Sequence, residues 1–219
     1  DKYIMEKVKK VIIVDDFALS RAILKKMIAS RSDFVVCGEF ENAEDCIEYL
    51  RNNDADLVIM DFCLPKMNGT NASNIIKTFS PRIKIVLLVS INTRSEILMS
   101  LFANVDAYAL KDVNQDQLLS IADKVFSSNI WVDFRIQHTI FNLIKYLPSS
   151  DYLYFKNLLT SNEGILIDMI LKGFDKGDIA KSLNVQLPDL AVAVRSIFKK
   201  LSKTKRVIQL VEDFKYDLV

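Results

Sequence analysis

The chain has 219 residues and half of them are apolar, so it is long enough for one or two domains with buried cores. Its 29 basic and 28 acidic residues leave a net charge of +1, so the net charge does not indicate any class of binding partner. Its three cysteines lack the spacing of a disulfide framework or a thiolate metal site. No apolar run reaches the ~20 residues of a membrane span and no signal-peptide pattern opens the chain, so we expect a cytoplasmic protein without membrane insertion.

Strand and helix patterns alternate over roughly the first 125 residues. Short β-branched runs predict strands at residues 11–15, 35–40, 57–60, 83–89 and 107–110. Helical spacing predicts helices at residues 19–31, 43–51, 71–78 and 95–103, and a last helix that begins at a capping box of Asn114 and Gln117 and ends at Phe126. These βα units predict a flavodoxin-like, doubly wound, five-stranded parallel sheet with strand order 2-1-3-4-5.

Strand patterns stop at Ser127, and the rest of the chain is predicted to be helical. An apolar helix is expected at residues 135–146, followed by helices at 161–171, 175–183, 188–202 and 205–213. Gly173 is suited to a helix C-cap and Asp175 to an N-cap, which gives a helix, a short turn and a second helix. We therefore expect an α/β domain at residues 1–128, a connector with a helix at 129–156 and an all-α helix-turn-helix domain at 157–219.

Polar side chains end the predicted strands. Asp15 and Asp16 end the first strand, Asp61 ends the third, and Ser90 and Lys111 end the fourth and fifth. Parallel strands bring their carboxyl ends to one edge of a sheet, so these groups are predicted to converge. Three neighbouring carboxylates favour a divalent cation, and oxygen ligands suit Mg²⁺. Asp61 is then a candidate nucleophile that forms an aspartyl-phosphate, with Lys111 and Ser90 contacting the phosphoryl oxygens.

In these strand-end residues the sequence resembles the receiver domain of two-component response regulators, over residues 7–128. The resemblance implies that Asp61 accepts a phosphoryl group from a sensor histidine kinase and that Ser90 and Lys111 assist the transfer. It implies that Ser90 and Tyr108 form a switch. It also implies the metal ligands, which are Asp15, Asp16, Asp61 and the backbone carbonyl of Cys63. One departure is Ile91, which follows Ser90 where receivers usually carry a small residue, and which is expected to slow phosphoryl chemistry by crowding.

A phosphohydrolase that uses Asp61 is a competing interpretation. Such hydrolases usually carry their acid–base Asp two residues after the nucleophile at the end of the first strand, whereas Asp15 is followed by Asp16 and Phe17. The order of the motifs therefore favours a self-phosphorylating phosphoacceptor over an enzyme.

Residues 159–201 resemble the LuxR/NarL-type helix-turn-helix of the same regulators, through the motifs LTSNE and GFDKGDIAKSLNV. The spacing makes residues 188–202 the recognition helix, with its core face formed by Leu190, Val194, Ile197 and Leu201. The expected DNA-contacting residues are Val192, Arg195, Ser196, Lys199, Lys200 and Lys203. Residues 191–206 hold six basic side chains and no acid, which suits phosphate contacts.

The recognition helix departs from the family where base contacts are expected. Asp189, Leu190, Ala191 and Ala193 replace the family's Thr, Val, Lys and His, so Ala191 and Val192 offer only apolar contacts to bases. The sequence thus predicts a response regulator that binds promoter DNA as a homodimer with shallow sequence preference. The alternative is an atypical or phosphorylation-independent regulator whose C-terminal domain serves protein interaction or dimerisation. A merely solvated basic helix face is the simplest competing interpretation of the charge run.

Overall fold

The computed structural model describes residues 8–90, 94–127, 131–144, 147–205 and 207–209. Contacts within the chain divide it into two compact units, one formed by Asp1–Val89 and Ala103–Ser128 and the other by Ser90–Phe102 and Asn129–Val219. The segment Ser90–Phe102 thus groups with the C-terminal residues and not with the sheet that precedes it. Within the described ranges no helix is long and apolar enough to cross a membrane.

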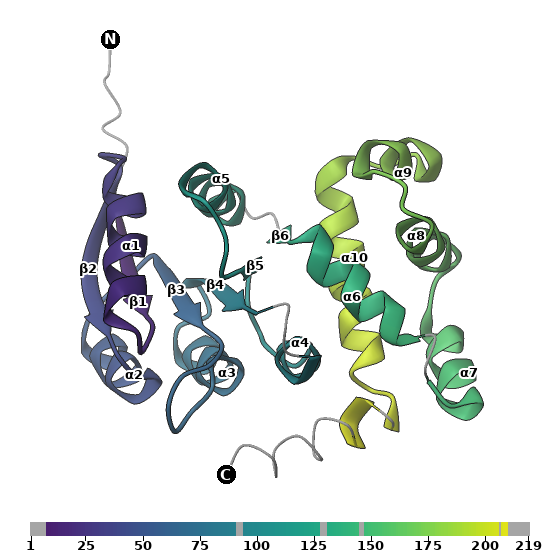
Figure 1. Cartoon of the computed structure of the whole chain (residues 1–219), viewed down its shortest axis with the longest axis horizontal. Coiled ribbons are helices and arrows are strands. Elements are labelled where there is room, and N and C mark those ends of the chain that lie inside the picture. Colours follow the sequence, from purple (N-terminus) through teal and green to yellow (C-terminus); the bar gives the residue numbers. More distant parts are fainter. Residues whose placement is uncertain (1–7, 91–93, 128–130, 145–146, 206, 210–219) are drawn as a thin grey trace. The chain divides into compact units, whose positions relative to one another are not determined.

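The first unit is built on a parallel sheet whose strands follow the order β2-β1-β3-β4-β5 (Figure 1). The strands are β1 (Lys9–Val14), β2 (Phe34–Phe40), β3 (Leu57–Asp61), β4 (Lys84–Val89) and β5 (Ala107–Leu110). Every residue of β3 and β5 is buried, which explains why these strands are continuous apolar runs without alternation. The predicted doubly wound sheet and the order of its first five strands are confirmed, whereas the predicted count of five strands is one too low, because the sheet has six strands among the described residues.

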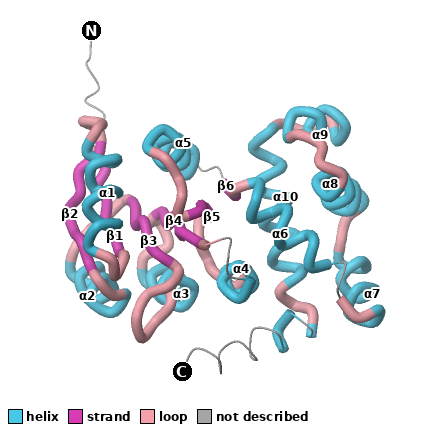
Figure 2. The backbone as a smooth tube through the Cα atoms, viewed as in Figure 1, coloured by secondary structure: helices cyan, strands magenta, loops and turns pink. Residues whose placement is uncertain are grey.

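Helices cover both faces of this sheet. They are α1 (Ala18–Ala29), α2 (Ala43–Asn52), α3 (Gly69–Phe79) and α5 (Gln115–Phe126). Helix α1 packs on α5 and α2 packs on α3, one pair on each face (Figure 2). The predicted capping box of Asn114 and Gln117 is present at the start of α5, where both reciprocal hydrogen bonds form.

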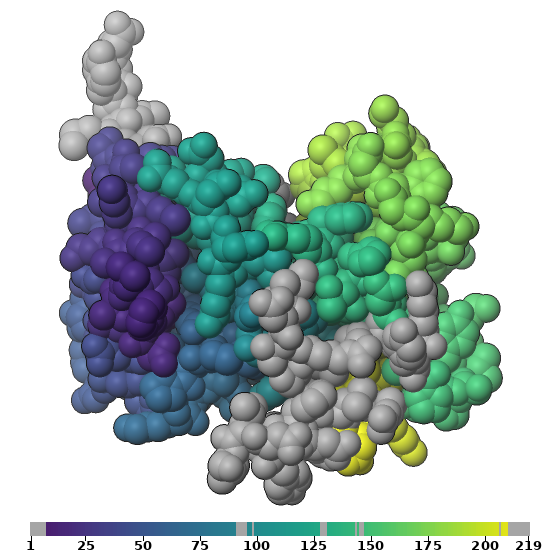
Figure 3. Space-filling view, viewed as in Figure 1, coloured from purple at the N-terminus to yellow at the C-terminus, as the bar shows by residue number. Residues whose placement is uncertain are grey.

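Helix α1 buries a narrower face than its sequence suggests, since helical spacing places Leu19, Ile23, Met27 and Ile28 on one apolar face. Leu24 and Ile28 are buried, but Leu19 is 60% exposed and Ile23 is 46% exposed. The space-filling view places α1 at the surface of the molecule (Figure 3). Helical spacing alone therefore did not separate the core-facing residues of α1 from apolar residues that face outward.

The second unit is mainly helical, as predicted. Its elements are α4 (Arg94–Ser100), β6 (Trp131–Val132), α6 (Phe134–Ile144), α7 (Ser149–Leu158), α8 (Ser161–Leu171), α9 (Lys176–Leu183) and α10 (Leu187–Leu201). The rings of Phe141 and Phe198 meet edge to face at 5.9 Å between centroids in its core. Gly173 follows α8 with φ of +82°, a left-handed conformation that suits a residue without Cβ.

Two elements of the second unit were not predicted, namely the two-residue strand β6 and helix α7. Pro148 is the N-cap residue of α7. The helix expected at residues 205–213 lies in large part outside the described residues.

Candidate functional site

Three carboxylates meet at the carboxyl edge of the sheet. Asp15 and Asp16 follow β1, Asp61 is the last residue of β3, and one oxygen of each lies within 4.8 Å of the others. Asp15 is 4% exposed and Asp61 is 2% exposed, whereas Asp16 is exposed. The structure therefore brings together the three acids that the sequence placed at strand ends.

Lys111 pairs with Asp61. Its Nζ lies 2.8 Å from Asp61 Oδ1 and donates a hydrogen bond to Oδ2 at 2.9 Å. Burial nevertheless raises the pKa of the Asp61 carboxyl to about 6, because the interactions with Lys111 and the Cys63 backbone do not fully offset the loss of water and the nearby charge of Asp15. A single ammonium thus leaves the charge of Asp61 incompletely compensated.

Asp15 is held in place by the start of α1. Its Oδ1 accepts a hydrogen bond from the backbone N–H of Phe17 at 2.9 Å, and its Oδ2 accepts one from Ser20 Oγ at 2.5 Å. Arg21 Nη1 donates to the Asp15 carbonyl at 2.7 Å. The positioning roles of Ser20 and Arg21 were not predicted, although their place in the first turns after the acidic pair was visible in the sequence.

The donor set suits a hard divalent cation. It consists of carboxylate oxygens, two of them on buried residues and one on an exposed residue that keeps contact with water. Mg²⁺ prefers such oxygen ligands and retains water molecules in its coordination sphere. The raised pKa of Asp61 points the same way, since burial destabilises the ionised form of this carboxyl and a nearby cation would stabilise it.

A cavity of about 320 Å³ adjoins the acid cluster and has both Asp15 and Lys111 in its wall. Most of its remaining wall comes from α1, including the exposed side chains of Leu19 and Ile23, and Phe17, the residue just before α1, is 64% exposed. The site therefore opens toward solvent beside an apolar surface and is not enclosed by the protein.

The other predicted residues of this site are placed as follows. Ser90 comes directly after β4, and its backbone N–H donates to Glu96 Oε2 at 3.0 Å. Tyr108 is 1% exposed, and its hydroxyl donates to the Ala103 carbonyl at 3.0 Å. Ile91 lies outside the described residues. The contact between Glu96 and the Ser90 backbone was not anticipated from the sequence.

Helix α10 presents the core face that the sequence predicts. Leu190, Val194, Ile197 and Leu201 are all buried, with at most 7% exposure. On the other side of the helix, Val192 is 52% exposed and Lys199 is exposed. Lys203, just beyond the helix, is also exposed, so an apolar side chain and two ammonium groups are accessible here.

Three of the residues expected to contact DNA, Arg195, Ser196 and Lys200, are only partly accessible to solvent. Two of them form hydrogen bonds with Glu163. Ser196 Oγ donates to Glu163 Oε1 at 2.7 Å, and Lys200 Nζ donates to Glu163 Oε2 at 2.5 Å. Arg195 is half-buried. Glu163 is 6% exposed and also closes the capping box of α8 with Thr160. The sequence motif LTSNE contains this acid, but only the fold reveals that it anchors α10.

Comparisons with known proteins agree with this geometry. The response regulator receiver domain family matches residues 11–123. "Response regulator protein VraR" of Staphylococcus saprophyticus is 26% identical over 210 residues, which cover 96% of this chain and 98% of that protein. The protein of the same name from Staphylococcus aureus is 26% identical over 216 residues, with the same coverage of 96% and 98%.

Solved structures show the same fold over both units. The two-component response regulator RcsB in complex with DNA matches with a TM-score of 0.57 and 20% identity, covering 94% of this chain and 98% of that one. RcsB from Salmonella enterica serovar Typhimurium, bound to a promoter in the presence of the phosphomimetic BeF3-, matches with a TM-score of 0.57 and 20% identity, covering 95% and 98%.

Proposed function

The chain belongs to the response regulator receiver domain family, and from that premise we propose that it is a two-component response regulator, phosphorylated on Asp61, that binds promoter DNA through its C-terminal unit. The observation that carries the proposal is the buried Asp61 carboxylate, paired with Lys111 and clustered with Asp15 and Asp16. Full-length similarity to VraR regulators supports it.

Phosphoryl transfer at this site requires a nucleophile and compensation of negative charge. A carboxylate oxygen of Asp61 attacks the phosphorus of a phosphohistidine on a sensor kinase, and the broken P–N bond leaves its electrons on the imidazole, which takes up a proton. Lys111 Nζ, 2.8 Å from Asp61 Oδ1, is placed to neutralise a phosphoryl oxygen. Asp15 and Asp16 would hold Mg²⁺ together with Asp61, and the ion when bound offsets the charge of the carboxylates and the phosphoryl group.

Further ligands and the switch complete the proposed receiver. The backbone carbonyl of Cys63 follows Asp61 closely enough in sequence to serve as a metal ligand, and the Ser90 hydroxyl is assigned to a phosphoryl oxygen. Tyr108 is assigned to the switch. A movement of its side chain has to break the hydrogen bond that its hydroxyl donates to the Ala103 carbonyl. The chemistry is that of a phosphoacceptor, in which the Asp61 carboxylate takes a phosphoryl group from a separate phosphodonor.

DNA binding is proposed for the exposed side of α10 and the residues after it. Lys199 and Lys203 are exposed and suited to phosphate contacts, and Val192 faces outward at the start of the helix. Arg195 remains the residue able to make a bidentate base contact. Ser196 and Lys200 belong to the proposed surface too, although their contacts with Glu163 mean that they first position the helix.

A protein-binding or dimerising output unit is the second candidate, because Leu187 and Val192 at the start of α10 are 56% and 52% exposed. Fluorescence anisotropy separates the two candidates. The protein, with and without BeF3- and Mg²⁺, is titrated onto a duplex from its own promoter region and onto a scrambled duplex. We expect binding that strengthens with BeF3-, as two phosphorylated subunits pair on half-sites. Absence of binding at low salt in both states would favour the protein-interaction candidate.

A further inference from the structure

A second polar depression lies at the opposite edge of the sheet from the aspartate cluster. Its volume is about 600 Å³, within the range of small-molecule sites. Its wall comes from the start of β1, the loop between α2 and β3, the loop between α3 and β4, and the end of α5. Lys9 and Lys10 begin the strand that Asp15 follows, so the depression and the aspartate cluster occupy the two ends of β1.

The charge of this depression is positive. Its wall holds the four cations Lys9, Lys10, Arg82 and Lys84, and two carboxylates, so four positive charges face two negative ones. One carboxylate, Asp56, uses its Oδ2 to accept the backbone N–H of Lys10 at 2.8 Å. The positive charge of the wall therefore exceeds what its own acids offset.

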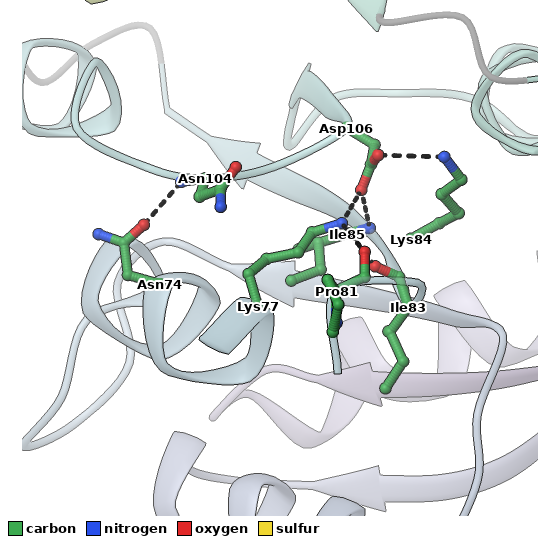
Figure 4. A network of polar contacts seen from close by, with 8 residues as sticks. All are labelled: Asn74, Lys77, Pro81, Ile83, Lys84, Ile85, Asn104 and Asp106. Carbon is green, nitrogen blue, oxygen red and sulfur yellow. Dashed lines mark hydrogen bonds and ion pairs between the residues drawn. The ribbon is translucent and has the colours of Figure 1, made fainter. Parts of the chain in front are cut away.

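Lys84 forms only a long ion pair with Asp106, an acid outside the wall (Figure 4). Its Nζ lies 3.3 Å from Asp106 Oδ1, whereas Lys77 Nζ lies 2.6 Å from Asp106 Oδ2, and the backbone N–H of Ile85 donates to the same Oδ2 at 3.0 Å. Lys77 also donates to the Ile83 carbonyl at 2.7 Å. Asp106 thus serves mainly to fix Lys77 and the start of β4, which leaves the Lys84 ammonium available to a ligand in the depression.

Lys10 and Arg82 are the most available cations. Both side chains are exposed, and among the described residues no carboxylate lies within ion-pairing distance of either. A guanidinium binds phosphate oxygens through two parallel hydrogen bonds, and an ammonium adds a point charge. Arg82 and Lys10 come from different segments of the wall, so an anion between them is contacted from two sides.

The aromatic rings of the wall, Phe79 and Phe126, restrict the class of ligand that the depression can bind. Lys9 Nζ lies 5.1 Å from the centroid of the Phe126 ring, and the guanidinium carbon of Arg51 lies 5.1 Å from that of Phe79. Each ring already has a cation over one face, so the wall is suited to charge and not to stacking of a nucleobase. We propose that this depression binds a compact anion that carries two or more phosphate charges.

Calorimetric titration of the full-length protein with inorganic pyrophosphate tests the proposal. EDTA is present so that no divalent ion draws pyrophosphate to the aspartate cluster, and sulfate at matched ionic strength is the reference anion. We expect saturable binding of pyrophosphate that is tighter than that of sulfate. Lys10→Gln and Arg82→Gln should each weaken it roughly tenfold, the loss expected for one charge-assisted hydrogen bond. Both residues are exposed, so both variants are expected to fold.

Two control variants locate the anion. Lys25→Gln removes an exposed lysine paired with Glu39, and Lys199→Gln removes a basic group of the C-terminal unit. Neither should change the affinity, and backbone amide shifts on adding pyrophosphate should centre on residues 9–10, 53–56 and 80–84. Binding no tighter than sulfate would overturn the proposal. An affinity lost in Lys199→Gln and kept in Arg82→Gln would also overturn it, because the anion would then sit on the C-terminal unit.

Discussion

Lys111 Nζ lies 2.8 Å from Asp61 Oδ1, and yet the pKa of the Asp61 carboxyl is about 6, above its usual value of 3.8. Burial outweighs the ion pair because Asp61 is 2% exposed, whereas 41% of the Lys111 side chain remains in contact with water. The ionised Asp61 carboxylate is therefore energetically unfavourable in the metal-free protein. Such incomplete compensation is common at functional positions.

Replacing Asp61 by Asn should stabilise the metal-free protein. A carboxyl whose folded-state pKa is raised contributes stability below its unfolded pKa and loses that contribution as the pH rises through about 6. At pH 7.5 in EDTA we expect Asp61→Asn to raise the free energy of unfolding by on the order of 2 kcal/mol. The gain should shrink as the pH falls from 7 to 4. Denaturant unfolding at several pH values measures it, with the exposed Asp54→Asn as control. If Asp61→Asn were less stable than the wild type at pH 7.5, the ion pair with Lys111 would outweigh burial.

Mg²⁺ should stabilise the wild-type protein and lose this effect when the acids are removed. At a free Mg²⁺ concentration about 100 times the dissociation constant, the gain should be roughly 2.7 kcal/mol. Asp15→Asn and Asp16→Asn should each reduce it, and protons should compete with the metal as the pH falls below about 6, where Asp61 becomes protonated. Thermal melts across a Mg²⁺ series measure the effect. An equal Mg²⁺ response in Asp16→Asn and wild type would place the ion elsewhere.

Glu163 should be a major source of stability in the second unit. Burial alone would raise its pKa, but hydrogen bonds from Lys200, the Thr160 backbone and Ser196 hold it below its usual 4.5. Its stabilisation is therefore present above the unfolded pKa and lost as the pH falls below about 4.5. Glu163→Gln should cost roughly 1–3 kcal/mol at pH 7, since it weakens buried charge-assisted hydrogen bonds.

The control for Glu163 is Asp168→Asn, which removes an ion pair with Lys172 whose two side chains are both 62% exposed. This variant should change stability by less than about 0.5 kcal/mol. Chemical denaturation of all three proteins at pH 7 provides the comparison. Equal losses in the two variants would mean that the Glu163 contacts are no stronger than a surface pair.

Lys199 and Lys200 are neighbours on α10 and should differ in effect. Lys199 is exposed, so Lys199→Gln should weaken binding to all DNA sequences and reduce the slope of log affinity against log salt by about 1. Lys200 donates to Glu163, so Lys200→Gln should lower the stability of the protein more than it changes the salt slope. Anisotropy across a salt series, together with unfolding curves, measures both. If the two variants reversed these effects, Lys200 and not Lys199 would be the phosphate contact.

The fold could be predicted in large part because its signals are local. Continuous apolar runs such as residues 57–60 mark strands buried on both faces, and the capping box of Asn114 and Gln117 marks a helix start. The short strand β6 and helix α7 escaped prediction because neither has such a signal. Helix α7 has three consecutive exposed apolar residues, Tyr152, Leu153 and Tyr154, which hide its helical period.

The aspartate cluster could be predicted because strand ends fix where side chains meet, whereas contacts between distant segments could not. The pair of Glu163 and Lys200 joins residues 37 positions apart, and the Asp15 contact with Ser20 depends on the path of the chain into α1. Spacing within one helix also failed for α1, where Leu19 and Ile23 are exposed, because burial depends on what packs against the helix and not on its sequence alone.

Phosphorylation of Asp61 is tested most directly by incubating the protein with a small acyl phosphate and Mg²⁺ and mapping the modified peptide by mass spectrometry. We expect one phosphoryl group on Asp61, removed by hydroxylamine, which cleaves acyl phosphates, and absent from Asp61→Asn. Lys111→Gln should retain the site but label more slowly, because the charge of the transferred group is less well neutralised. Labelling of equal extent in Asp61→Asn, or wild-type label on any other residue alone, would contradict the assignment of Asp61 as the phosphoacceptor.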